Sequence, residues 1–236
     1  MSRRAIVLAG GKGTRLRPYT VVLPKPLMPI GEYPILEVIV RQLAHHGFGH
    51  ITLAVNHQAH LIQAFFGNGE RWGVYIDYSQ ENSPLSTVAP LRLIENLPDN
   101  FLLLNGDILT DLDFNRLFCE HVAARRLFTI AAHRRTQAVD YGVIEVDAHN
   151  TLTGFSEKPS VDYLVSMGVY AVNKSVLSFV PPQQPYGFDN LMRDLLAGGE
   201  RVKVEPYEGY WLDIGRPDDY IQAIEEFDQW KPRFLP

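Results

Sequence analysis

Short apolar runs alternate with segments of helical spacing through the first half of the chain. Runs of strand length lie at 5–9, 51–55, 74–78, 101–104 and 128–132, and helical spacing occurs at 34–46, 58–66, 87–93 and 114–124. Strands that are almost entirely apolar are typical of a sheet buried on both faces, and intervening helices join parallel strands. We therefore expect an α/β fold with a mostly parallel central sheet and helices on both faces.

The pattern changes from Tyr141 onward. Strand-like pieces follow at 141–146, 151–156 and 164–172, then short helices at 174–179 and 188–197, strand pieces near 201–205 and 210–213, and a last helix from 217 to about 230. Pro217 suits the first turn of that helix, and Asp218 and Asp219 suit its positive end. We predict a single domain over 1–236, in which a mixed-sheet half (136–236) closes a pocket against a nucleotide-binding half (1–135).

Charge and composition narrow the class of ligand. The 236 residues carry a formal net charge of -5, which disfavours nucleic acid or an anionic membrane as partner. Basic residues nevertheless gather at Lys12, Arg15, Arg17 and Lys25. A local positive site on an acidic protein fits a small anionic ligand.

Cysteine usage and hydropathy indicate the compartment. The single cysteine, Cys119, excludes a disulfide within the chain and favours a reducing compartment, and its apolar helical surroundings predict that it is buried. The apolar run at 5–9 is too short for a signal peptide or a membrane span. We expect a cytoplasmic protein.

A glycine-rich basic loop follows the first strand. The run from Gly10 to Arg15 reads Gly-Gly-Lys-Gly-Thr-Arg, and Pro24-Lys25-Pro26 comes shortly after it. Glycines let backbone N–H groups turn toward an anion, and arginine can fork onto phosphate oxygens. The run lacks the Lys-Ser/Thr ending of a Walker A loop, and Leu16 stands where a dinucleotide fingerprint needs its third glycine. Two cationic elements behind one strand predict a polyphosphate site.

Two aspartates stand at the ends of apolar strands. Asp107 follows the run at 101–104, and Asp213 lies within the apolar stretch 210–214. Ligands bind outside the carboxyl ends of parallel strands, and two carboxylates suit one hard cation such as Mg²⁺. The alternative for Asp107 is a turn cap, and either Asp111 or Asp113 is expected to cap the helix near Phe114. The eight histidines show no zinc spacing.

The motifs together resemble a known family. Gly-Gly-Lys-Gly-Thr-Arg-Leu-Arg-Pro-Tyr-Thr, Pro-Lys-Pro-Leu-Met-Pro-Ile, Asn-Gly-Asp, Glu-Lys-Pro and Trp-Leu-Asp-Ile-Gly-Arg-Pro occur in that order. Over residues 4 to about 226 the chain resembles the sugar-1-phosphate nucleotidyltransferases. The resemblance implies a Rossmann-like nucleotidyltransferase fold. It also implies in-line, Mg²⁺-assisted attack of a sugar 1-phosphate on the α-phosphate of a nucleoside triphosphate, releasing pyrophosphate.

The resemblance also implies residue roles. Catalysis would fall to Arg15, Lys25, Asp107 and Asp213, with Asp107 and Asp213 as the metal ligands. The nucleotide contacts would be Leu8, Ala9, Gly10, Gly11, Gly13, Thr14, Arg15, Gln80, Glu81, Ser86 and Thr87. The sugar-phosphate contacts, all in the second half of the chain, would be Gly142, Glu157, Lys158 and Gly168. For Glu157-Lys158-Pro159 the alternative is a solvated turn.

Three departures from the family pattern concern specificity. Ser86 replaces a glycine of the base-reading loop, and the pattern leaves open whether Gln80 or Glu81 meets the base. Ser166-Met167-Gly168 stands where the family has Asn-Ala-Gly, which suggests a sugar other than plain glucose.

The resemblance favours a guanylyl- or uridylyltransferase that makes precursors of cell-surface polysaccharide. The alternative is a catalytically silent regulatory paralogue that binds nucleotide or NDP-sugar. The apolar residues Phe227, Trp230, Phe234 and Leu235 are candidates for a contact between identical subunits, or for packing back on the domain.

Overall fold

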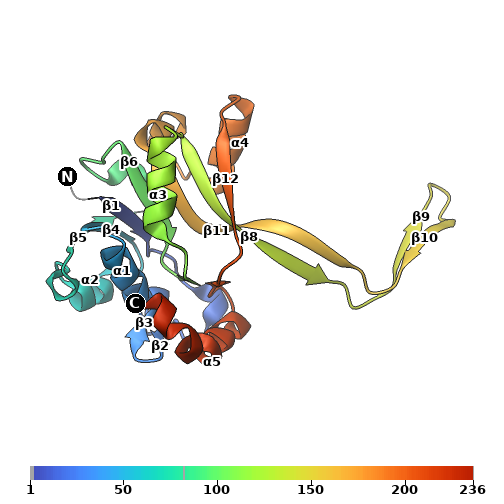
Figure 1. Cartoon of the computed structure of the whole chain (residues 1–236), viewed down its shortest axis with the longest axis horizontal. Helices are drawn as coiled ribbons and strands as arrows, with labels where there is room; N and C mark the ends of the chain where they lie inside the picture. The colour runs from blue at the N-terminus through green and yellow to red at the C-terminus, as the bar shows by residue number, and fades with distance from the viewer. Residues whose placement is uncertain (1–2, 82, 236) are drawn as a thin grey trace.

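A seven-stranded sheet forms the centre of the computed structural model, which describes residues 3–81 and 83–235 (Figure 1). The strand order is β12-β8-β11-β6-β1-β4-β5, and β11 runs antiparallel to both of its neighbours. The strands are β1 (Arg4–Leu8), β4 (His50–Val55), β5 (Tyr75–Gln80), β6 (Asn100–Asn105), β8 (Phe128–Ala138), β11 (Ser160–Asn173) and β12 (Val202–Tyr207). The predicted mixed, mostly parallel sheet is confirmed.

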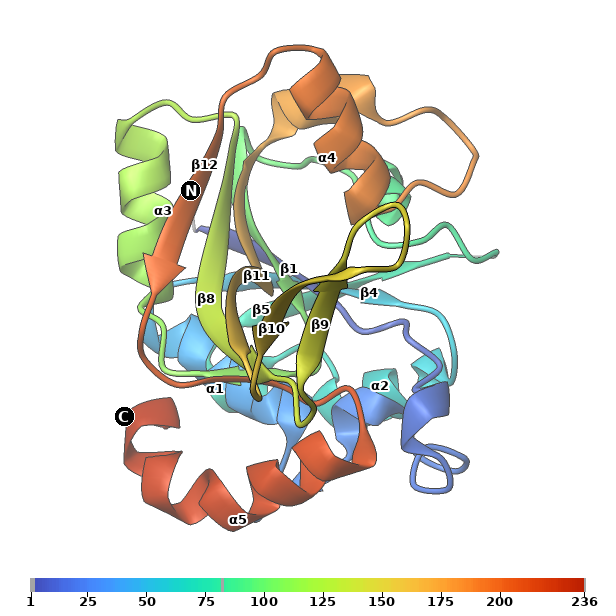
Figure 2. The ribbon, with the colours of Figure 1, turned by 90° about the vertical axis from the view of Figure 1, so that its right-hand side faces the viewer.

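Helices cover both faces of this sheet (Figure 2). Successive residues of β1 point to opposite faces, so Val7 packs with α1 (Ile35–His45), α2 (Ala59–Phe66) and α3 (Phe114–Ala123). Ile6 packs on the other side with α4 (Phe188–Ala197) and the 3₁₀ turn Ala89–Leu93. Burial on both faces explains why the first strands are almost entirely apolar.

A third apolar cluster holds the C-terminal helix against the body. It joins α5 (Pro217–Phe234) to two short antiparallel pairs, β2 (Pro29–Ile30) with β3 (Tyr33–Pro34) and β7 (Ile108–Thr110) with β13 (Trp211–Asp213). Phe227 and Phe234 are buried in it, and Trp230 packs on Tyr210. These aromatic residues therefore pack back on their own domain.

A long two-stranded ribbon projects from the body (Figure 1). The root of the ribbon is formed by the C-terminal part of β8, which pairs with the N-terminal part of β11. The far end of the ribbon carries the hairpin of β9 (Val143–Val146) and β10 (Leu152–Ser156). We call residues 133–165 the arm and residues 139–159 the arm tip. The arm extends away from the body (Figure 1).

Several boundaries differ from prediction. The segments expected to be helical at 87–93 and 174–179 form 3₁₀ turns, Ala89–Leu93 and Lys174–Phe179. Strands β8 and β11 are also longer than the predicted strands at 128–132 and 164–172, because both include polar residues beyond the apolar runs. Of the two aspartates expected to cap α3, Asp111 and Asp113, it is Asp113 that accepts a hydrogen bond from Arg116 N (2.9 Å).

Two further features are the exposure of Cys119 and the apolar character of the helices. The prediction that Cys119 is buried is wrong, because it lies on the exposed side of α3 near Asn115. Within the described residues, none of the helices combines the length and apolar character needed to cross a bilayer.

The third cluster makes the fold testable. Phe227→Ala leaves a cavity beneath α5, and the lost packing lowers stability by about 3 kcal/mol or more. That corresponds to a fall in melting temperature of roughly 6 °C or more for a chain of this size. Ile224→Ala, on the exposed side of the same helix, is the matched control, and circular dichroism melts compare the two. Equal melting temperatures would contradict the packing of α5.

Candidate active site

The glycine-rich loop leaves the carboxyl end of β1 and is fixed from beneath. Gly13 has a φ of 60°, and a Cβ there would lie 2.9 Å from Thr20 Cγ2. Thr20 Oγ1 donates a hydrogen bond to Gly13 O (2.7 Å), and buried Leu16 anchors the 3₁₀ turn Thr14–Leu16. Arg15 remains exposed on this fixed loop. Its side chain is therefore free to meet an anion.

A pocket of about 490 Å³ opens beside this loop. Such a volume suits a small-molecule ligand. Its lining includes Leu8, Ala9, Gly10, Gly11, Lys25, Glu81, Ser86, Thr87 and Asp107 from the expected nucleotide and catalytic residues. The carboxyl ends of four neighbouring strands, β6, β1, β4 and β5, therefore meet at one concave site, as the order of the parallel strands requires.

A charged pair lies at one end of the pocket. The buried Lys25 side chain forms an ion pair with Asp107 Oδ2. Asp107 Oδ1 is also buried, and it accepts no hydrogen bond from any described residue. An orphaned carboxylate oxygen in this position suits a cation.

Asp213 joins this pair from the late part of the chain. Strand β13 pairs with β7 so that Asp213 lies opposite Ile108, directly after Asp107. Burial raises the pKa of Asp213, the nearby Asp107 carboxylate raises it further, and Lys25 and Arg15 partly oppose the rise. The described residues contain no group of three or more His, Cys, Asp or Glu side chains suited to a metal. Two carboxylates still fit Mg²⁺, which keeps waters and takes phosphate oxygens.

The loop that follows β5 is held in place by side-chain hydrogen bonds. Glu81 accepts hydrogen bonds from Asn56 Nδ2 (2.8 Å) and Leu85 N (2.9 Å), so its carboxylate braces the loop. Gln80 points into a separate depression beside Arg4. The structure therefore brings Glu81, and not Gln80, to the pocket.

Ser86 adopts the backbone conformation that its family counterpart, a glycine, prefers. Its φ is 69°, which is unusual for a residue with a side chain. The next residue ties this loop to α4, because Thr87 Oγ1 accepts a hydrogen bond from Phe188 N (2.9 Å).

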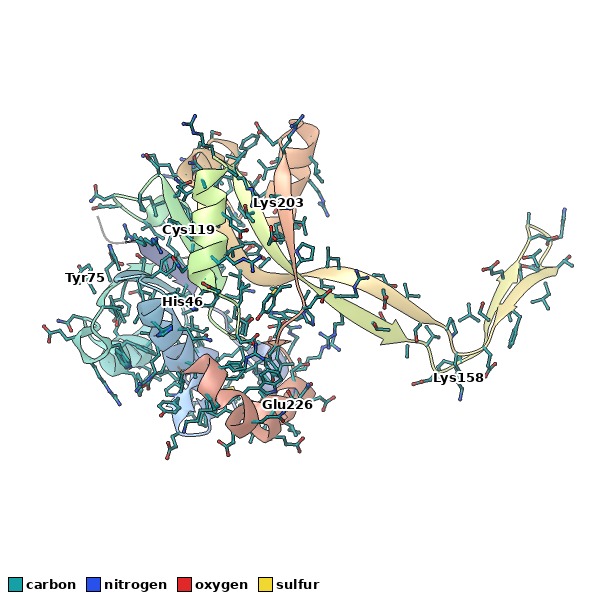
Figure 3. The ribbon with its side chains drawn as sticks, viewed as in Figure 1. His46, Tyr75, Cys119, Lys158, Lys203 and Glu226 are labelled. Atoms are coloured by element: carbon teal, nitrogen blue, oxygen red, sulfur yellow. The ribbon has the colours of Figure 1, made fainter. Side chains whose placement is uncertain are left out.

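The expected sugar-phosphate residues are separated. Gly168 lies beside the pocket, where a Cβ would come within 2.5 Å of Asn105 Nδ2. Gly142 and Glu157 lie together on the arm tip, since a Cβ on Gly142 would be 3.2 Å from Glu157 Oε2. Figure 3 shows Lys158 at the bend of the arm, away from the body. One copy therefore does not bring the two groups together.

A second hollow, of about 610 Å³, lies between the glycine-rich loop and the root of the arm. Arg15 and Asp213 line it from the body, and Arg135 and Tyr163 line it from the arm. The expected sugar contacts Glu157 and Lys158 are not among its lining residues.

Three polar residues of the site were not predicted. Asn56 and Asn105 line the pocket, and Thr20 supports the loop. Asn56 directly follows β4, and Asn105 ends β6. The carboxyl ends of parallel strands were therefore the available signal.

Comparison with known proteins identifies this arrangement. The family model described as nucleotidyl transferase matches residues 4–229. The chain belongs to the nucleotidyl transferase family. Within that family it is 33% identical to a UTP–glucose-1-phosphate uridylyltransferase of Synechocystis and to a mannose-1-phosphate guanyltransferase of Candida albicans. The family resemblance stated from the motifs is confirmed.

The alignments differ in how much of each protein they include. They cover 94% and 93% of this chain but 62% and 63% of the two relatives, so the chain spans under two thirds of their length. A solved structure titled HddC from Yersinia pseudotuberculosis complexed with GMP-PN matches with a TM-score of 0.74 and 24% identity. It covers 96% of this chain and 100% of its own, which confirms the nucleotidyltransferase fold.

The carboxylate pair predicts a gain in stability when one charge is removed. Asp213→Asn, measured in EDTA at neutral pH, raises the melting temperature by about 2 °C or more, because it removes a desolvated charge beside Asp107. A raised folded-state pKa means that the ionised carboxylate lowers stability above that pKa. The gain therefore shrinks as pH falls through the pKa of Asp213.

The exposed Asp228 provides the control for this measurement. Asp228→Asn removes the same charge from an exposed position on α5, and we expect little change in melting temperature. A lower melting temperature for Asp213→Asn than for wild type would show that the two carboxylates do not repel each other.

Proposed function

We propose that this protein transfers a nucleotidyl group from a nucleoside triphosphate to a sugar 1-phosphate, giving an NDP-sugar and pyrophosphate. The observation that carries the proposal is the meeting of the glycine loop, Lys25 and Asp107 at one largely apolar pocket, with Asp213 close to Asp107 and lining the second hollow together with Arg15. The names of the two relatives at 33% identity support the same reaction.

The phosphates would lie across the glycine loop. Backbone N–H groups from Gly10 to Gly13 and the exposed Arg15 would hold the leaving pyrophosphate. Lys25 is nearly buried, so its charge acts in a poorly solvated place and would stabilise the α-phosphate as negative charge builds there. The nucleoside would lie in the apolar part of the pocket beside Ser86 and Thr87.

The chemistry would need no covalent enzyme intermediate. A sugar phosphate oxygen attacks the α-phosphorus, the bond to the pyrophosphate oxygen breaks, and the protein contributes position and charge. Asp107 and Asp213 would hold Mg²⁺, which would neutralise phosphate charge when bound. Gly168 lets backbone approach the sugar side of the pocket, and Glu157 and Lys158 would bind the sugar hydroxyls and phosphate.

We favour GTP or UTP as donor, because the two relatives are named as a guanyltransferase and a uridylyltransferase. We propose synthesis of a polysaccharide precursor as the purpose. The Ser-Met-Gly sequence at 166–168 favours a sugar other than glucose. A single free cysteine suits a reducing compartment, and we place the reaction in the cytoplasm.

Pyrophosphate release tests the proposal. ATP, GTP, CTP, UTP and dTTP are each incubated with Mg²⁺ and a pool of sugar 1-phosphates, and we expect release with one or two bases. Asp107→Ala and Asp213→Ala each lower the rate by about 100-fold or more, while Asp228→Ala retains it. Nucleotide binding without release for every base would instead support the silent paralogue.

A further inference from the structure

The arm tip presents an apolar face that no other described residue covers. In the β9–β10 pairing Ile144 lies opposite Phe155, and Val146 lies opposite Leu152. Opposite residues share one face of a sheet, and these four side chains are 50–63% exposed. An isolated two-stranded hairpin is marginally stable in water, and an exposed apolar cluster marks an interaction surface.

The root of the arm fixes the direction in which it leaves the body. Strands β8 and β11 pair continuously from Ala138 with Ser160 to Ala132 with Ser166. Trp211 Nε1 donates a hydrogen bond to Met167 O (2.9 Å), just behind this ribbon. These interactions hold the root of the arm in the extended direction that Figure 1 shows.

The arm tip also carries the residues that the site lacks. Gly142, Glu157 and Lys158 lie on it, and the hollow beside Arg15 and Asp213 has no lining from them. Figure 3 shows Lys158 far along the arm. A single copy therefore keeps Gly168 beside the pocket but holds Gly142, Glu157 and Lys158 on the arm tip.

The body offers a surface that complements the tip. Between the glycine loop and Lys25, the apolar side chains Tyr19, Val21, Val22 and Leu23 are 40–74% exposed. Gln58 Nε2 donates a hydrogen bond to Val22 O (3.1 Å), which holds this loop in place.

Charge favours the same contact. The tip carries four acidic side chains and one lysine. Lys12, Arg15 and Arg17 are exposed on the neighbouring glycine loop. The acidic, apolar tip therefore complements the basic, apolar surface formed by the glycine loop and residues 19–23.

We propose that two copies of this chain exchange arms, so that the tip of each covers the 19–23 loop of the other and delivers Glu157 and Lys158 to its phosphate site. A two-fold dimer makes the exchange reciprocal and closes the assembly. The catalytic part of this inference rests on the proposed function; the exchange itself does not.

Light scattering tests the exchange without reference to activity. We expect the wild-type chain to form a dimer. Ile144→Glu places a charge on the apolar face of the tip, and we expect this variant to be a monomer with an unchanged circular dichroism spectrum. Leu196→Glu introduces the same charge at an exposed site on α4 and leaves the dimer intact. A monomeric wild type, or a dimer that survives Ile144→Glu, overturns the proposal.

Complementation tests delivery to the site. Asp213→Asn damages the body of one copy, and Lys158→Ala damages the arm of another. In a randomly mixed dimer population, about a quarter of the sites then combine an intact body with an intact arm, so mixing restores measurable pyrophosphate release. Mixing Asp107→Asn with Asp213→Asn, both in the body, restores none. Equal silence in both mixtures would overturn delivery between copies.

If the wild-type protein releases no pyrophosphate with any substrate pair, the proposed function is wrong, but the arm exchange can still be tested by cross-linking. In a Cys119→Ser background, Thr14→Cys in one copy and Lys158→Cys in a larger, tagged copy are treated with a short bismaleimide. A product containing both copies supports the exchange. Cross-linking only when both cysteines occupy the same copy contradicts it.

Discussion

The site depends on a balance of charge between Lys25, Asp107 and Asp213. One lysine and two aspartates meet at a place with limited access to water, so the second carboxylate is only partly compensated. Such a cluster is costly in the absence of a ligand and becomes favourable when a cation and a polyphosphate enter together. Other features of the site hold these three groups in place. The β7–β13 pair sets Asp213 beside Asp107, and the α5 cluster supports that pair.

A second constraint is the exposed apolar face of the arm tip, which we propose is covered by a second copy of the chain. The tip is amphipathic, and the root of the arm is held by a continuous strand pair, so the apolar face must be covered by something other than its own body. A site completed by a partner links catalysis to association, because dissociated copies keep the nucleotide pocket and lose the sugar contacts.

Much of the fold could be predicted from the sequence. The buried strands of the first half have a strong apolar signal, and their order along the chain placed Asp107 and the glycine loop at the same sheet edge. The outer parts of β8 and β11 could not be predicted, because strands exposed on both faces have no apolar period. The direction of the arm is tertiary information, so the separation of Lys158 from Lys25 had no signal in the sequence. The bracing role of Glu81 likewise depends on Asn56, a residue that directly follows another strand, β4.

We propose that Asp107 and Asp213 form a metal-dependent nucleotide site with the glycine loop. The most direct measurement is the melting temperature of wild type and Asp213→Asn with GTP or UTP, each in Mg²⁺ and in EDTA. We expect nucleotide to raise the wild-type melting temperature more in Mg²⁺ than in EDTA, and Asp213→Asn to lose this difference. An equal nucleotide shift in Mg²⁺ and EDTA for wild type would show that the two aspartates do not form a metal-dependent nucleotide site.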